Sequence, residues 1–86
     1  MVSYKILVKQ SAEKELRKIS PPNLTKIVNR IHSLSNQPRP SGAQMLKGEA
    51  RYYRIRQGDY RVIYEINDAE KFVNVIKIGH RREVYD

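Results

Sequence analysis

The most constraining feature of this sequence is a succession of three strand-like segments in its second half. Residues 51–57, 60–66 and 71–78 are rich in Tyr, Ile and Val, which favour β-strands, and only short polar turns separate them. The first turn, Gly58-Asp59, has the two-residue length typical of a β-hairpin. Consecutive strands joined by such turns pair in antiparallel fashion. The pattern therefore predicts an antiparallel meander.

The first half of the chain predicts one strand and two helices. Residues 3–8 have strand composition, and Ser11 is placed to cap a helix that ends before two consecutive prolines. Residues 35–48 contain two prolines and two glycines and are expected to form a loop. The second helix has an apolar stripe at spacings of three and four, formed by Leu24, Ile27, Val28, Ile31 and Leu34. Its expected outward face consists of Lys26, Asn29, Arg30 and Ser33.

These elements predict a single α+β domain over residues 1–86. Its expected order is β-α-α-β-β-β, with two N-terminal helices packed on one face of a small, mostly antiparallel four-stranded sheet. Strand 60–66 is apolar on both faces and should lie at the centre of the sheet.

The net charge of +8 indicates a polyanionic partner, of which nucleic acid is the leading candidate. The chain has no cysteine and two histidines, so disulfides, thiolate metal sites and a zinc site are not expected. No apolar run is long enough for a membrane span, and the N-terminal residues are too polar for a signal peptide. We therefore expect a cytoplasmic protein without a metal ion, a small-molecule cofactor or a membrane partner.

Arginines occupy positions within the predicted sheet. Side chains alternate across a strand, which places Tyr52, Arg54 and Arg56 on one face and Tyr53 and Ile55 on the other. If the helices cover the apolar face, the two arginines stand together on the open face. Adjacent cations repel unless an anion lies between them, so we favour a binding role over simple solvation.

Arg61 falls in the strand expected to be central. A cation at such a position either pairs with an acid, such as Glu65, or meets a ligand, and the pattern leaves both readings open. Further positive charge and one stacking candidate surround the predicted sheet. The candidates to contact RNA are Lys47, Arg51, Tyr52, Lys77 and Arg82, although general surface charge is the simpler reading of Lys47, Arg51 and Lys77.

The C-terminal segment GHRREVYD contains several side chains that can take part in binding or catalysis. His80 can move protons near neutral pH, Arg81 and Arg82 can bind phosphate through paired hydrogen bonds, and Tyr85 can donate a proton or stack on a base. A charged chain end without a specific role is the alternative interpretation. The sequence pattern by itself does not separate the two.

Three segments together resemble toxins of the RelE family, within the wider RelE/ParE superfamily of toxin–antitoxin systems. They are LKG at 46–48, YRIRQGDYRVIYEI at 53–66 and VIKIGHRREVY at 75–85. The resemblance covers essentially the whole chain and implies a RelE-like fold. It also implies a toxin that cuts messenger RNA in the ribosomal A site, without metal, and that a RelB-like antitoxin neutralises.

The resemblance assigns roles to individual residues. The family's paired basic residues fall on Arg54 and Arg56, and its next strand arginine falls on Arg61. Its arginine after the last strand falls on Arg81, and its C-terminal tyrosine falls on Tyr85. Some members have lysines at the paired positions, and a lysine can accept a proton whereas an arginine keeps its own.

The first two of these arginines are therefore expected to hold the substrate. Some relatives have a glutamate near position 44, where this chain has Gln44, which cannot act as that base. His80 and Tyr85 are the two candidates for the substitute acid or base.

Two other functions remain in view. A ParE-like toxin would share the fold but act by binding DNA gyrase, without cleaving RNA. A basic module that binds RNA or the ribosome without catalysis is the second. The set of arginines with a C-terminal tyrosine favours the nuclease over a ParE-like toxin, since ParE-like members generally lack it. Only an assay separates the nuclease from the binding module.

Overall fold

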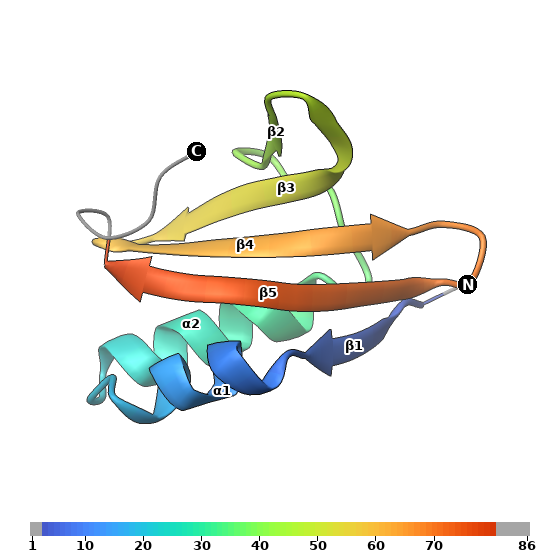
Figure 1. Cartoon of the computed structure of the whole chain (residues 1–86). Coiled ribbons are helices and arrows are strands. Elements are labelled where there is room, and N and C mark those ends of the chain that lie inside the picture. Colours follow the sequence, from blue (N-terminus) through green and yellow to red (C-terminus); the bar gives the residue numbers. More distant parts are fainter. Residues whose placement is uncertain (1–2, 81–86) are drawn as a thin grey trace.

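The computed structural model describes residues 3–80, which form the predicted α+β architecture (Figure 1). The sheet has five strands rather than four, because part of the segment predicted as a loop forms a short strand. The elements are β1 (Lys5–Val8), α1 (Gln10–Arg17), α2 (Asn23–Ser33), β2 (Gln44–Leu46), β3 (Glu49–Gln57), β4 (Tyr60–Asn67) and β5 (Phe72–His80).

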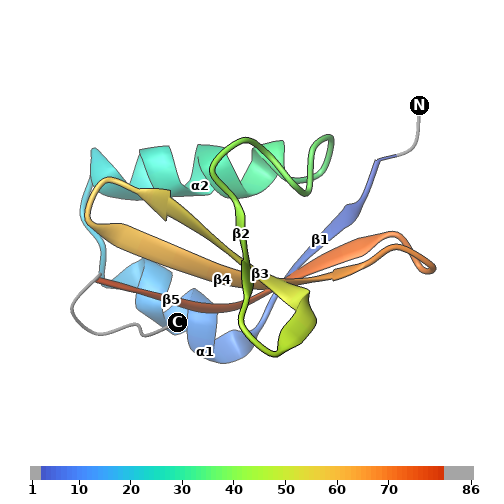
Figure 2. The same ribbon diagram turned by 90° about the horizontal axis from the view of Figure 1, so that it is seen from above.

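The strands lie in the order β1-β5-β4-β3-β2, so β4 is central, as predicted. The β3, β4 and β5 strands form the expected antiparallel meander, and β1 pairs with β5 in parallel. Gly58 in the first turn has a positive φ of 61°, which a two-residue hairpin turn requires and glycine tolerates. The added strand, β2, lies antiparallel to β3 at the sheet edge, and Figure 2 shows the chain after α2 returning over β3.

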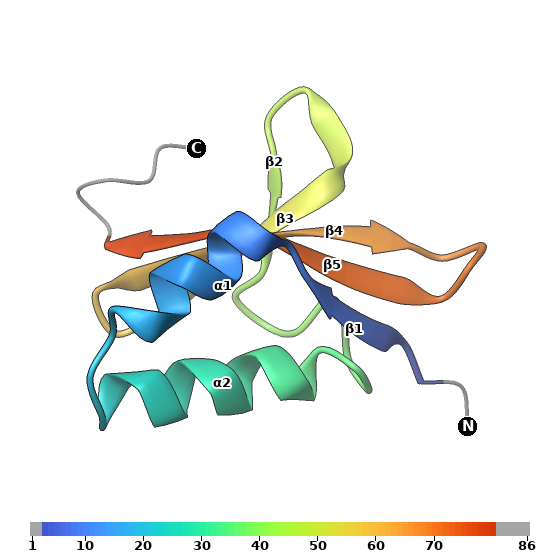
Figure 3. The same cartoon turned by 60° about the horizontal axis from the view of Figure 1, so that its bottom comes forward.

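Both helices lie below the strands in Figure 1, and Figure 3 shows them side by side and joined by a short turn. The α1 helix begins at Gln10 after Lys9, and no side chain caps it, so the predicted cap by Ser11 is wrong. No helix in residues 3–80 is both long and apolar enough to cross a bilayer. One core joins the two helices to the sheet through Ala12, Ile19, Ile27, Ile31, Leu34, Ile55, Val62, Tyr64, Ile66, Val73, Val75 and Ile78.

A β-bulge changes the facing of side chains along β5. Ile63 pairs with Lys77 but Tyr64 pairs with Val75, which leaves Ile76 as an extra residue in β5. A bulge of this kind interrupts the strict alternation of the strand. The buried positions are therefore odd-numbered before the bulge, whereas Ile78 is buried after it.

A polar network fastens the loop after α2 to the sheet. The fully buried Tyr64 donates a hydrogen bond of 2.7 Å from its hydroxyl to the carbonyl of Pro38. Next along the loop, Arg39 donates from Nη2 to Asp68 at 2.8 Å and from Nε to the hydroxyl of Tyr53 at 3.0 Å. Hydrogen bonds from Arg39 hold the pKa of Asp68 down at about 2. The loop after α2 is thus fastened to β3, to β4 and to the turn that follows β4.

Candidate functional site

The face of the β3–β4 hairpin that points away from the helices carries three arginines. Ile55 and Val62 belong to the core shared with the helices, and side chains alternate along each strand. Arg54 and Arg56 therefore lie together on the opposite face, as predicted, and Arg61 lies there with them. Arg56 is directly opposite Arg61 in the register, and Cβ atoms in such pairs lie about 4.5–5.5 Å apart. We call Arg54, Arg56 and Arg61 the arginine cluster.

Arg54 is buried rather than open to solvent, which corrects the expectation of two exposed arginines. Only 6% of its surface is accessible, because the unpredicted β2 strand lies beside it and its Nη2 donates a hydrogen bond to Oε1 of Gln44. Burial lowers the pKa of Arg54, and the nearby charges of Arg61 and Arg56 lower it further. A guanidinium remains charged at neutral pH, so the site holds a buried cation beside two like charges.

A fourth arginine, which the sequence analysis assigned to solvent, joins two members of the cluster. Arg30 of α2 lines a cavity of about 270 Å³ together with Arg54, Arg56, Gln44 and Gly42. Its Nε is buried and has no hydrogen-bond partner within the described part of the chain. Positive charge from a helix and from a strand thus converges on one hollow.

Glu65 lies on the same face of the sheet as the arginine cluster. Its carboxylate is 3.6 Å from Nε of Arg51, and the Arg51 guanidinium lies 5.1 Å from the centre of the Tyr52 ring. The guanidinium of Arg51 therefore lies against the ring of Tyr52, which is our candidate for base stacking. Arg51 is an exposed residue at the border of this surface, consistent with a general electrostatic role.

Two predicted RNA-contacting lysines are exposed. Lys77 pairs with Ile63, which in turn pairs with Arg54, so Lys77 lies on the face of the arginine cluster. Lys47 is exposed in the turn between β2 and β3. The structure thus extends the positive surface from β3 across to β5.

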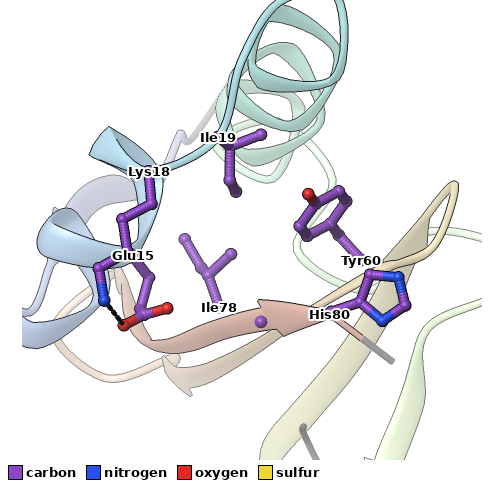
Figure 4. Close-up of a pocket in the computed structure, with 7 residues that line it drawn as sticks. Glu15, Lys18, Ile19, Tyr60, Ile78 and His80 are labelled. Atoms are coloured by element: carbon purple, nitrogen blue, oxygen red, sulfur yellow. Dashed lines mark hydrogen bonds and ion pairs between the residues drawn. The ribbon is translucent and has the colours of Figure 1, made fainter. Parts of the chain in front are cut away.

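His80 does not lie with the arginine cluster, which corrects its expected place beside them. The strand continues to His80 instead of ending at Gly79, and His80 pairs with Tyr60 on the helix side of the sheet. The two rings make an edge contact with their centres 5.7 Å apart. Figure 4 shows this pair at a cavity of about 350 Å³, opposite the ion pair of Glu15 and Lys18.

The remaining predicted site residues are Arg81, Arg82 and Tyr85, and they lie outside the described residues 3–80. Within that range, no three side chains of His, Cys, Asp or Glu gather as a metal site would require. The described part of the site therefore offers guanidinium and ammonium groups as its ligand-binding chemistry.

Comparison with known proteins supports the predicted resemblance. A family model described as the ParE toxin of the type II toxin–antitoxin system parDE matches residues 6–85. Toxin RelG of Mycobacterium tuberculosis is 28% identical over 83 residues, and the match covers 95% of each protein.

Solved structures show the same fold. A chain of the archaeal RelE–RelB complex from Pyrococcus horikoshii superposes with a TM-score of 0.84 at 25% identity, covering 96% of this chain and all of that one. A chain of the toxin–antitoxin complex RelBE2 from M. tuberculosis gives 0.81 at 29% identity, covering 93% of this chain and all of its own. This chain therefore belongs to the RelE/ParE superfamily of type II toxin–antitoxin toxins and has the RelE fold.

Proposed function

We propose that this toxin is a ribosome-dependent endoribonuclease that cuts messenger RNA in the ribosomal A site. The observation that supports this proposal is the arginine cluster, three guanidiniums held on one face of a rigid hairpin. A guanidinium can donate two parallel hydrogen bonds to phosphate oxygens. Several of them around one phosphodiester would stabilise the extra negative charge of its transition state.

The proposed reaction is an internal transfer at phosphorus. The ribose 2′-oxygen attacks the adjacent phosphorus and loses its proton, while the bond to the 5′-oxygen of the next nucleotide breaks. The products are a 2′,3′-cyclic phosphate and a 5′-hydroxyl. Arg54 and Arg56 would hold the substrate, Arg61 and Arg81 would stabilise the transition state, and Tyr85 would give a proton to the leaving oxygen.

Because arginines keep their protons, the 2′-hydroxyl proton would pass to a water molecule or to a group of the ribosome. His80 faces the other side of the sheet, so the proposal gives it no place at the arginine cluster. This shortage of acid and base groups is consistent with an enzyme that needs the ribosome to orient its substrate.

The alternative of a ParE-like toxin that binds DNA gyrase shares the fold and the family model. The arginine cluster together with Arg81 and Tyr85 favours the nuclease over this alternative, because a toxin that only binds gyrase would have no need of groups that stabilise a phosphoryl transition state and protonate a leaving oxygen. A basic module that binds RNA without cleaving it is separated from the nuclease by a cleavage assay.

The deciding experiment adds purified toxin to ribosomes stalled on a defined message, with ribosome-free message and a gyrase supercoiling assay in parallel. We expect cuts only on the ribosome, with cyclic phosphate ends. Arg61→Gln, Arg81→Ala and Tyr85→Phe should each slow cleavage by about 10²–10³. Arg17→Gln, which changes an exposed residue paired with Glu13, should cleave normally. Gyrase inhibition without cleavage would refute the nuclease.

The proposed partners are the ribosome, messenger RNA and a RelB-like antitoxin, and the proposed compartment is the cytoplasm. Structural relatives are RelE toxins solved in complexes with RelB. The net charge of +8 predicts an antitoxin whose toxin-binding segment is acidic. Co-purification with the neighbouring gene product, and loss of cleavage on its addition, would test this pairing.

A further inference from the structure

The cavity of about 270 Å³ between α2 and the outer edge of β3 has the character of an anion site. Three guanidiniums line it, and no carboxylate of the described chain does so. The lining arginines are Arg30, Arg54 and Arg56. We propose that this cavity binds a phosphate group of an RNA strand, and that Arg30 is part of the RNA-binding surface.

Arg30 reaches the cavity from the helix layer rather than from the sheet. Its Nη2 lies over Gly42, 4.0 Å from where a Cβ at that glycine would stand. Its Nε is buried and donates no hydrogen bond to any residue in the range 3–80. A buried donor without an acceptor is costly, and an oxygen atom entering the cavity would remove that cost.

Four ion pairs of the described chain lie away from this cavity. Glu13 pairs with Arg17, Glu15 with Lys18, Asp68 with Arg39 and Glu65 with Arg51. Arg30 takes part in none of these four pairs, so none of these four acids neutralises its charge.

A phosphate fits this lining better than a carboxylate does. A carboxylate matches the two-pronged face of one guanidinium, whereas a phosphodiester offers oxygens in several directions and can accept from guanidiniums on different sides. The cavity is smaller than the roughly 300–1,000 Å³ of sites that enclose whole small molecules, which suits a single group.

RNA is the expected source of the phosphate because the cavity adjoins the arginine cluster. Arg56 lines the cavity and also faces Arg61 across the hairpin. A strand whose scissile phosphate lies at the cluster would place a neighbouring phosphate in the cavity. This step rests on the proposed nuclease function, but binding itself requires no cleavage, so the two can be tested apart.

The direct test follows the arginine Nε–H signals by NMR during titration with a short single-stranded RNA, with inorganic phosphate, and with an acidic peptide. Addition of RNA should move the signals of Arg30, Arg54 and Arg56. The signal of Arg39, whose Nε donates to the Tyr53 hydroxyl, should stay in place. The proposal is overturned if the Arg30 signal does not move when RNA is added, whether or not it moves with inorganic phosphate or with the peptide.

A matched pair of variants tests the energetic role of Arg30. Arg30→Gln and Lys26→Gln remove one charge each from the same helix. Arg30→Gln should weaken RNA binding about tenfold and make the plot of log affinity against log salt shallower by about 0.7. Lys26→Gln should change neither. Equal losses in the two variants would show only general electrostatic attraction and would overturn the site.

Two further measurements separate the possible failures. Arg30→Lys keeps the charge but not the paired donors and should bind RNA more weakly than the original protein, which keeps the test valid if Arg30→Gln fails to fold. Cleavage by the same proteins on stalled ribosomes is scored independently. If none of them cleaves, the nuclease proposal fails while the binding result stands.

Discussion

Replacement of Arg56 by glutamine should stabilise the fold while it weakens the site. Arg56 is exposed and directly opposite Arg61, and like charges in that position repel. Glutamine keeps much of the side-chain length and removes the charge. The gain arises because the folded state holds the two cations close together and the unfolded chain does not.

The size of this gain follows from the register. Two unit charges about 6 Å apart in water repel by about 0.7 kcal/mol, and directly opposite like charges on a sheet cost roughly 0.2–1 kcal/mol. We therefore expect the free energy of unfolding to rise by about 0.5 kcal/mol. For a domain of this size, that change raises Tm by about 2–4 °C.

Urea unfolding at about 20 mM and about 1 M salt provides the assay, because salt at the higher concentration screens charges beyond about 3 Å. The stabilisation by Arg56→Gln should appear at low salt and disappear at high salt. Arg17→Gln, which breaks the exposed pair with Glu13, should instead lose up to about 0.5 kcal/mol at low salt. A variant at Arg56 that is less stable than the original at low salt, or equally stabilised at both, would refute the reasoning.

Two further predictions concern stability. Tyr64→Phe leaves the buried Pro38 carbonyl without its hydrogen bond and should cost about 1.5 kcal/mol, or roughly 6–12 °C in Tm, by thermal unfolding. The folded protein holds the Asp68 pKa at about 2, below its ordinary 3.8, chiefly through Arg39, so the unfolded chain takes up that proton first. Stability should therefore fall as the pH drops from about 4 to about 2, as unfolding at a series of pH values would show.

Each of these predictions has a matched control. Tyr52→Phe removes a hydroxyl from a half-buried tyrosine in the neighbouring strand and should leave Tm unchanged. An equal loss in both variants would mean that the Tyr64 hydrogen bond is not the cause. Asp68→Asn should flatten the pH dependence between about 4 and 2, and an unchanged profile would assign that dependence to other acids.

Local patterns were sufficient for the meander and its two faces. Short turns force neighbouring strands to pair, and alternation then decides which side chains point to the helices. The grouping of Arg54 and Arg56 on one face followed from alternation, and the central position of β4 followed from its apolar residues on both faces. The second helix was equally clear, because its apolar stripe matches the helical period.

The short strand β2 could not be predicted from its own residues. Gln44–Leu46 is only three residues long and is flanked by proline and glycine, and it becomes a strand because the edge of β3 offers it hydrogen-bond partners. The burial of Arg54 was missed for the same reason, since the neighbour that covers it was not foreseen.

The facing of His80 was not predicted, because His80 was expected to lie beyond the end of the strand and because β5 contains a bulge. Strict alternation from Val73 and Val75 would place position 80 on the face of the arginines. The extra residue at Ile76 reverses the alternation and sends His80 to the helix side, beside Tyr60. A bulge depends on pairing between strands and leaves little trace in the sequence of one of them.

Arg30 was assigned to solvent because it lies outside the apolar stripe of α2. It comes three residues after Ile27 and four before Leu34, and residues at these spacings are neighbours on a helix surface. That border position was a usable signal. What the sequence could not reveal is that the helix border meets the edge of β3 near Gly42.

The parallel pairing of β1 with β5 has a consequence for how the nascent chain matures. Lys5 pairs with Phe72 and Val8 with Val75, so the first strand has no place in the sheet until translation has passed residue 75. Contacts between segments so distant along the polypeptide form late, because a large loop must close before they bring any gain. The β1 strand can therefore join the sheet only after residues 72–75 of β5 have been synthesised, although its own residues are translated much earlier.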